Sequence, residues 1–122
     1  MQTDRRALGT HYEQIAKRYL LDQGLTFLTA HFNCRWGEID LVMRTATEIV
    51  FVEVRFRRHA AIVDPIASID THKRKRLCRT AGYYLAQLGG DHPARFDVVA
   101  ISDTIQGQTT IDWIANAFDC GN

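Results

Sequence analysis

Apolar and polar side chains alternate through the segment GEIDLVMRTATEIVFVEVRFR (residues 37–57), which is typical of two consecutive β-strands. Because neighbouring strand residues point to opposite faces of a sheet, the charged side chains of each arm gather on one face. A short loop through Thr45–Glu48 that keeps the apolar faces together sets Asp40 opposite Glu53. The pattern therefore predicts a β-hairpin that carries two facing carboxylates.

Facing residues in an antiparallel pair lie roughly 5 Å apart, and two like charges at that distance destabilise the pair. The carboxylates of Asp40 and Glu53 therefore favour a compensating cation, and a divalent metal ion would serve. The same register sets Glu38 opposite Arg55. The hairpin thus predicts an acidic pocket with basic neighbours.

Helical spacing of apolar residues predicts one helix over Thr10–Gln23 and a longer one that begins near Asp70 and ends at Gly89. Apolar runs predict three further strands, Leu25–Asn33, Arg95–Ser102 and Thr109–Ile114. Since the long helix joins the hairpin to the next strand, the chain must cross over the sheet. We expect an α/β fold with a mixed central sheet flanked by helices, in the order α-β-β-β-α-β-β.

A chain of 122 residues that is 46% hydrophobic suffices for one compact domain, which we expect to span residues 1–122. No run approaches the ~18 apolar residues of a membrane span, and the first residues lack the apolar stretch of a secretory signal. Three widely spaced cysteines argue against a disulfide framework or a structural zinc site. These features predict a cytoplasmic protein.

Positive charge is concentrated between Arg55 and Arg79, where eight Lys or Arg residues accompany two Asp residues, although the whole chain carries only +1. Such asymmetry predicts a surface for a polyanion, while a solvated helix face explains a charge run at least as well. No aromatic residues are interleaved with these charges, so we expect contacts to the phosphate backbone. The candidate nucleic-acid-binding residues are Arg57, Arg58, Lys73, Arg74, Lys75 and Arg76.

An acidic residue followed by Glu-x-basic at a strand end, here Asp40 and Glu53-Val54-Arg55, resembles the PD-(D/E)xK nuclease superfamily. From Glu13 to Phe118 the chain also resembles the YraN-like family of uncharacterised bacterial proteins, on the motifs GEIDLV, FVEVRFR, KRKRL, AGYYL, RFDVVAI and IDWIANAF. That resemblance implies a restriction-endonuclease-like three-layer core, shared with archaeal Holliday-junction resolvases. It also implies nuclease activity on structured DNA, with DNA favoured over RNA, and leaves a homodimer open.

The resemblance further implies that Asp40 and Glu53 ligate a catalytic Mg²⁺ or Mn²⁺, with Glu13 at the edge of the site and Glu38 as an auxiliary carboxylate. Mg²⁺ prefers carboxylate oxygens and retained waters, lowers the pKa of a bound water, and neutralises charge on phosphoryl oxygens. Arg55 departs from the pattern of the nuclease superfamily, which normally has Lys at that position. Arginine can clamp a phosphate but cannot deprotonate.

Simpler interpretations remain open for each residue. Glu13 lies four residues before Lys17, so an ion pair on the helix surface explains it equally well. The hairpin charges could form ordinary cross-strand pairs on a solvated face. Asp97 most simply pairs with Arg95. For the whole chain, the alternatives to a nuclease are a nucleic-acid-binding module that has lost turnover, which Arg55 favours, and a docking surface for a protein.

Overall fold

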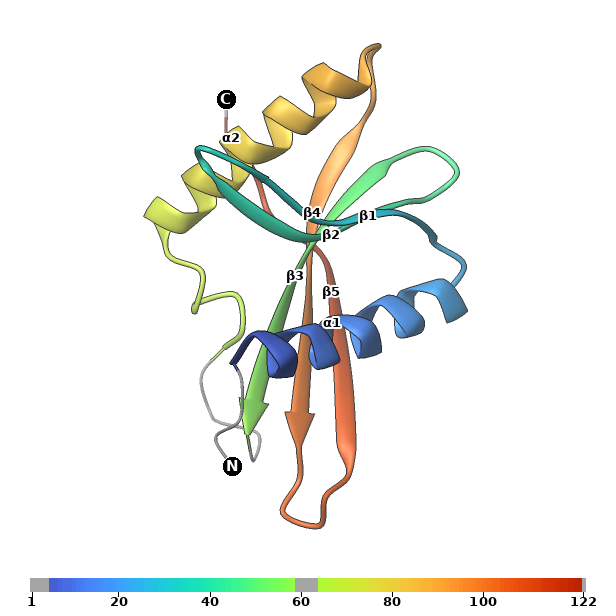
Figure 1. The fold of residues 1–122 in the computed structure, drawn as a ribbon, viewed down its shortest axis with the longest axis vertical. Coiled ribbons are helices and arrows are strands. Elements are labelled where there is room, and N and C mark those ends of the chain that lie inside the picture. The colour runs from blue at the N-terminus through green and yellow to red at the C-terminus, as the bar shows by residue number, and fades with distance from the viewer. Residues whose placement is uncertain (1–4, 59–63, 122) are drawn as a thin grey trace.

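The computed structural model describes residues 5–58 and 64–121, and its elements follow the predicted order along the chain (Figure 1). The elements are α1 (Arg5–Asp22), β1 (Thr26–Cys34), β2 (Gly37–Arg44), β3 (Ile49–Arg58), α2 (Thr71–Leu88), β4 (Ala94–Asp103) and β5 (Thr109–Phe118). Two bounds differ from prediction by more than one residue, since α1 begins earlier than Thr10 and β5 extends beyond Ile114. Most of the loop expected between β3 and Pro65 lies outside the described residues.

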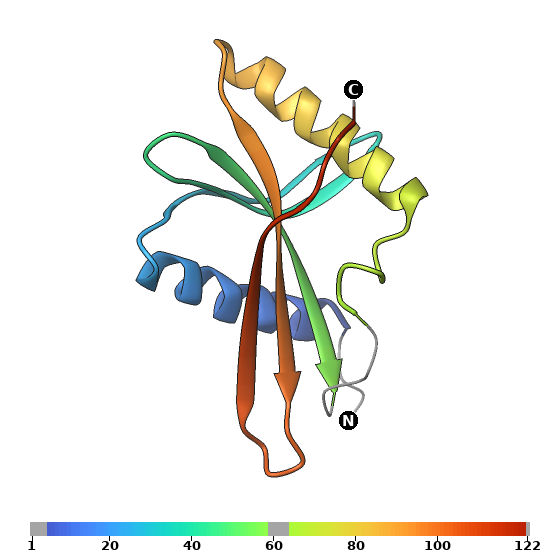
Figure 2. The ribbon, with the colours of Figure 1, turned by 180° about the vertical axis from the view of Figure 1, so that it is seen from behind.

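The five strands form one mixed sheet in the order β1-β2-β3-β4-β5. Neighbouring strands are antiparallel except β3 and β4, which run parallel because α2 carries the chain back across the sheet. On β3, Val50 and Val52 pack with the α1 cluster, whereas Ile49 and Phe51 pack with the α2 cluster. The two helices therefore cover opposite faces of the sheet, which confirms an α/β fold with helices on both sides (Figures 1 and 2).

The β2–β3 hairpin has the register that the sequence predicts, from Arg44 opposite Ile49 to Leu41 opposite Val52. Backbone pairing between β2 and β3 ends there. At the next position of β2, the Oδ2 of Asp40 accepts a hydrogen bond of 2.8 Å from the Val54 amide of β3. Beyond this point β2 pairs only with β1. The two strands thus part where the acidic residues lie, which leaves room for a pocket.

The α2 helix has the predicted ends. Asp70 is its N-terminal cap and accepts a hydrogen bond of 2.8 Å from the Lys73 amide, while Gly89, with φ of 75°, ends the helix in a conformation that suits glycine. Within the described ranges, neither helix is long and apolar enough to cross a membrane.

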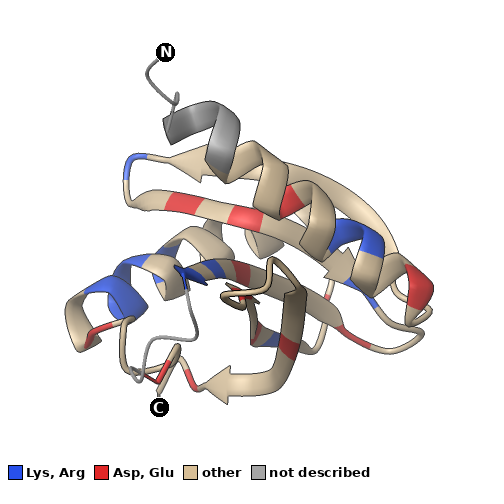
Figure 3. Ribbon diagram, turned by 90° about the horizontal axis from the view of Figure 1, so that it is seen from below, with Lys and Arg blue, Asp and Glu red and all other residues tan. Residues whose placement is uncertain are grey.

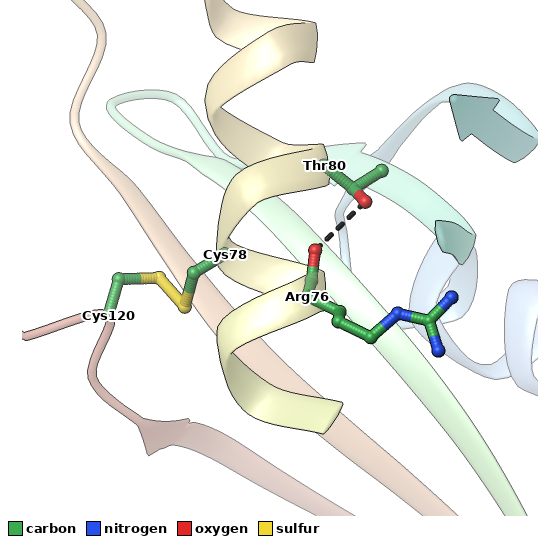
Figure 4. The surroundings of a disulfide bond; sticks show 4 residues. All are labelled: Arg76, Cys78, Thr80 and Cys120. Atoms are coloured by element: carbon green, nitrogen blue, oxygen red, sulfur yellow. Dashed lines mark hydrogen bonds between the residues drawn. A yellow bond between two sulfur atoms is a disulfide. The ribbon is translucent and has the colours of Figure 1, made fainter. Parts of the chain in front are cut away.

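The structure contains one disulfide, although the cysteine spacing argues against a disulfide framework. After β5 the chain runs back beside α2 (Figure 2), and a disulfide joins Cys78 of α2 to Cys120 across a separation of 42 residues. Figure 4 shows this bond on one side of α2, with the Arg76 side chain leaving the helix on the other side. Counting cysteines could not reveal the pair, because an odd number at wide spacing carries no pairing signal.

Candidate metal centre

The hairpin carboxylates line a pocket of about 400 Å³ between the sheet and the start of α2. Figure 3 shows acidic residues on β2 and basic residues gathered along the first half of α2. The lining residues are Gly37, Glu38, Asp40, Glu53, Asp70, His72, Lys73, Arg76 and Leu77. Residues far apart in the sequence therefore form one acidic pocket with a basic rim.

Glu53 is the most unusual residue of the pocket, because its carboxylate is only 2% exposed. It shares the face of β3 with Ile49 and Phe51, which pack against α2, so the fold draws it inward. Its Oε1 has no hydrogen-bond partner among the described residues. Burial first, and then the charge of Asp40, raise its pKa from 4.5 to about 8.

Asp40 is less buried and is held in place by the hydrogen bond from the Val54 amide. Burial raises its pKa, and that hydrogen bond together with the cations Lys73 and Arg55 offsets part of the effect. The two carboxyl groups influence each other, since the charge of Asp40 raises the pKa of Glu53. Asp40 and Glu53 therefore form one coupled acidic pair, as the sequence predicts.

Two cations approach the buried carboxylate from different elements. Arg55 Nη2 lies 3.9 Å from Glu53 Oε2, and Lys73 Nζ lies 3.7 Å from the same oxygen. The sequence marks Lys73 only as part of a basic run, yet the crossing of α2 over the hairpin brings its ammonium to the carboxylate. No local sequence signal distinguishes Lys73 from its basic neighbours.

Arg74 makes three contacts within the protein itself. Its Nε donates to the Ile69 carbonyl at 2.8 Å and its Nη2 to the Ile66 carbonyl at 3.1 Å, while the guanidinium lies over the Phe118 ring. These bonds anchor the segment before α2. The guanidinium therefore has a structural role, and a nucleic-acid contact of Arg74 stays a prediction.

Glu13 and Glu38 meet at one residue that the sequence reasoning missed. His31 Nε2 lies 2.7 Å from Glu13 Oε2, and its Nδ1 lies 3.2 Å from Glu38 Oε1. His31 has φ of 55°, which is uncommon for a residue other than glycine and orients its ring between the two carboxylates. The predicted pairing of Glu38 with Arg55 is wrong, because the hairpin pairing ends before it reaches them.

Glu13 also differs from its simpler interpretation. Lys17 places its ammonium over the Phe27 ring, 3.7 Å from the ring centre, while the Glu13 carboxylate contacts His31. Burial, and then the charge of Asp40, raise the pKa of Glu13. Glu13 therefore lies close enough to the acidic pair to influence it, as expected for a residue at the edge of the site.

The remaining candidates lie around this centre. Arg76 lines the pocket and donates from Nε to the Trp36 carbonyl at 2.8 Å. Lys75 and Arg58 are exposed, whereas Arg57 is half-buried with an Nε that has no hydrogen-bond partner among the described residues. The exposed cations can reach a polyanion, so the basic rim stays a prediction for nucleic-acid contacts.

The comparisons with known proteins identify the family. The model of "Uncharacterised protein family UPF0102" matches residues 12–101. The chain belongs to the UPF0102 family. A UPF0102 protein of Nitrosomonas europaea is 48% identical over 111 residues, which cover 91% of this chain and 92% of the relative. Another, of Pectobacterium carotovorum, is 47% identical over 118 residues, which cover 94% and 96%. The family resemblance is thus confirmed, while membership of the nuclease superfamily stays a prediction.

The pocket of this UPF0102 chain suits a hard divalent cation. The donors are carboxylate oxygens, and Glu53 offers a buried oxygen that lacks any hydrogen-bond partner in the described chain. No three His, Cys, Asp or Glu side chains of the described ranges come together as a complete metal site. Mg²⁺ does not need such a cage, because it usually binds through one or two carboxylates, substrate phosphate and waters. Asp40 and Glu53 would hold it.

Proposed function

We propose that this UPF0102 protein is a divalent-metal-dependent nuclease that hydrolyses phosphodiester bonds in structured DNA. One observation carries the proposal: a buried, coupled carboxylate pair, with a buried Glu53 oxygen that has no hydrogen-bond partner in the described residues, lines a pocket rimmed by cations. Burying two carboxylates costs free energy unless positive charge compensates them, and a divalent ion would supply that charge. Perturbed carboxyl groups that face a pocket are typical of functional sites.

In this proposal each residue has a separate task. A bound ion would activate a water molecule and offset negative charge on the phosphate. Asp40 and Glu53 would hold the ion, and the Val54 amide, which donates to Asp40, fixes the orientation of that carboxylate. Arg55 lies within 3.9 Å of Glu53 and contacts the transferring phosphate, for which its planar guanidinium is well suited. The water would lose a proton to solvent as its oxygen bonds to phosphorus, while the bond from phosphorus to one ester oxygen breaks and that oxygen takes up a proton from solvent and leaves as an alcohol.

Lys73 supplies the ammonium that the hairpin lacks. The superfamily signature resembled by this hairpin has Lys where this chain has Arg55, and Lys73 Nζ lies 3.7 Å from Glu53. A compact ammonium on a flexible stem can follow the phosphate as charge builds on it. We therefore expect Lys73→Met to lower cleavage more than Lys75→Met, a substitution of the exposed Lys two residues along the same helix.

The proposal is tested by giving purified protein branched, nicked and single-stranded DNA with Mg²⁺ or Mn²⁺. Wild type should cleave at least one of these substrates, and Asp40→Ala and Glu53→Ala should lose cleavage while still binding DNA. Cleavage that persists undiminished in both variants would eliminate the assignment. Titration calorimetry with Mn²⁺ alone provides a readout that needs no substrate, because Asp40→Asn should abolish metal binding.

A second candidate is a nucleic-acid-binding module with no turnover, and one observation favours it. Arg55 and Lys73 already neutralise part of the Glu53 charge, so the pocket has a cation source of its own. The two candidates separate in a comparison of wild type with Arg55→Lys. If neither cleaves, and both bind DNA with an affinity that falls steeply with salt, the binding module is correct.

A further inference from the structure

An aromatic and cationic surface lies at the turn between β1 and β2, next to the carboxylate pocket. Arg35 and Trp36 form this turn, since Cys34 pairs with Gly37. Arg76 Nε donates to the Trp36 carbonyl at 2.8 Å and so fastens the turn to α2. The sequence places no aromatic residue within the basic run, but folding brings Trp36 to it from 40 residues away.

This surface contains a second pocket, of about 540 Å³, within the range that holds small ligands. Aromatic rings form part of its wall, and the Tyr83 side chain among them is 47% exposed. Two amide side chains, Asn33 and Gln87, also line it and offer hydrogen-bond donors and acceptors. Among the described residues no acidic side chain lines this pocket. Its chemistry therefore suits a flat, apolar group that carries polar edges.

Two positively charged side chains lie over the Trp36 ring of this pocket. The guanidinium carbons of Arg35 and Arg79 lie 4.5 Å and 4.7 Å from the centre of the Trp36 ring. Both arginines are exposed, so each guanidinium can contact phosphate or stack a base beside the Trp36 ring, while the Tyr83 ring is open to the base. Aromatic side chains beside arginines are the usual means by which proteins hold unpaired bases. The positive charge at this pocket favours a polyanion over an uncharged, apolar partner.

We propose that this second pocket stacks an unpaired base of the DNA substrate against Trp36 and Tyr83. It lies beside the carboxylate pocket, because Arg76 lines that pocket and donates to the Trp36 carbonyl, and Gly37, which also lines that pocket, is the residue after Trp36. The substrate class is therefore DNA in which a single strand leaves a duplex near the cut. The statement that the strand is cut near this pocket rests on the proposed function.

Binding without metal tests the inference. In EDTA, the anisotropy of labelled DNA compares a short single strand, the matching duplex, and that duplex with a single-stranded flap. Stacking is worth ~1–3 kcal/mol per base, so Trp36→Ala and Tyr83→Ala should weaken single-strand and flap binding by about 5-fold to 100-fold. Duplex binding should stay within about twofold. Lys75→Ala is the matched control for charge, and it should weaken all three ligands alike.

Intrinsic fluorescence gives an independent readout, because Trp36 and Trp113 are the two tryptophans of the chain. Single-stranded DNA should quench the emission of Trp113→Phe, in which Trp36 remains, and should leave Trp36→Phe unquenched. Equal losses on duplex and single strand, or no loss in either alanine variant, would overturn the inference. Tighter binding to a matched RNA strand would overturn the assignment to DNA.

The experiment also separates this inference from the proposed function. Cleavage with Mn²⁺ that is intact when stacking is absent refutes the base pocket alone. Stacking that is intact when no metal-dependent cleavage occurs refutes the nuclease alone.

Discussion

Replacing Glu53 with glutamine should make the protein more stable at alkaline pH. The carboxyl group is buried, its Oε1 has no hydrogen-bond partner among the described residues, and its pKa is raised to about 8. Between its ordinary pKa of 4.5 and about 8, the folded protein holds a proton that the unfolded chain releases. Wild-type stability is therefore full at low pH and falls as the pH rises through this interval.

The magnitude follows from the width of the interval. Each pH unit between the two pKa values contributes about 1.4 kcal/mol, so the stability lost by pH 9 is on the order of 5 kcal/mol. Because Glu53 titrates together with Asp40, part of this loss belongs to the pair. Glutamine resembles the protonated acid in shape and charge. The variant should therefore match wild type near pH 5 and exceed it by about 3 kcal/mol near pH 9.

This difference is measured by urea unfolding at several pH values, in EDTA to exclude metal. A shift of the urea midpoint with an unchanged m-value reports a change in the free energy of unfolding. Asp22→Asn is the control, because it removes a carboxylate that is 64% exposed and whose one ion pair among residues 5–58 and 64–121 is with Arg18 of the same helix. A plot of its free energy of unfolding against pH should run parallel to the plot for wild type. If the Glu53→Gln curve also runs parallel to wild type from pH 5 to pH 9, burial of a charged carboxylate is refuted.

Four further predictions follow from the same structure. At pH 8, Mn²⁺ at about 100 times its Kd should stabilise wild type by about 2.7 kcal/mol and leave Asp40→Asn unchanged in thermal unfolding. Asp97 is 0% exposed and accepts hydrogen bonds from Arg95 and from the Trp113 ring, so Asp97→Ala should cost about 3 kcal/mol in urea unfolding. Cys120→Ser should cost about 3 kcal/mol in the absence of reductant, and dithiothreitol should lower the midpoint of wild type only. Asp70→Ala should cost about 1 kcal/mol by removing the α2 cap, whereas Asp70→Asn should restore most of it.

The sequence predicts the hairpin well because its information is local. Alternation fixes which side chains share a face, and a one-residue slip would turn every apolar side chain of the arm outward. The observed pairs from Arg44 with Ile49 to Leu41 with Val52 obey this constraint. Asp97 is likewise paired with Arg95, two residues away on the same strand, as expected. Local periodicity also gives both helices and the order of the elements.

The site depends on contacts that no local pattern contains. His31 reaches Glu13 and Glu38 only because its backbone adopts φ of 55°, and the sequence offers no sign of that conformation. The end of hairpin pairing at Leu41 is equally hidden, because alternation continues through the residues that no longer pair. Contacts between elements depend on how the helices cross the sheet. Sequence periodicity does not determine that crossing.

Two adjacent basic residues of α2 show why the sequence alone cannot assign a role to each residue of a charge run. Lys73 and Arg74 are adjacent in the sequence, yet the turn of the helix sends the first to the Glu53 carboxylate and the second to the carbonyls before α2. Successive helical residues point about 100° apart, so adjacent cations meet different surroundings. Arg76 points in a third direction and holds the turn that carries Trp36. The basic run therefore divides into a residue for the carboxylate pocket, a structural anchor, and a link to the base pocket. In the proposed function, this division lets a nearly neutral protein position both a metal ion and a strand of DNA.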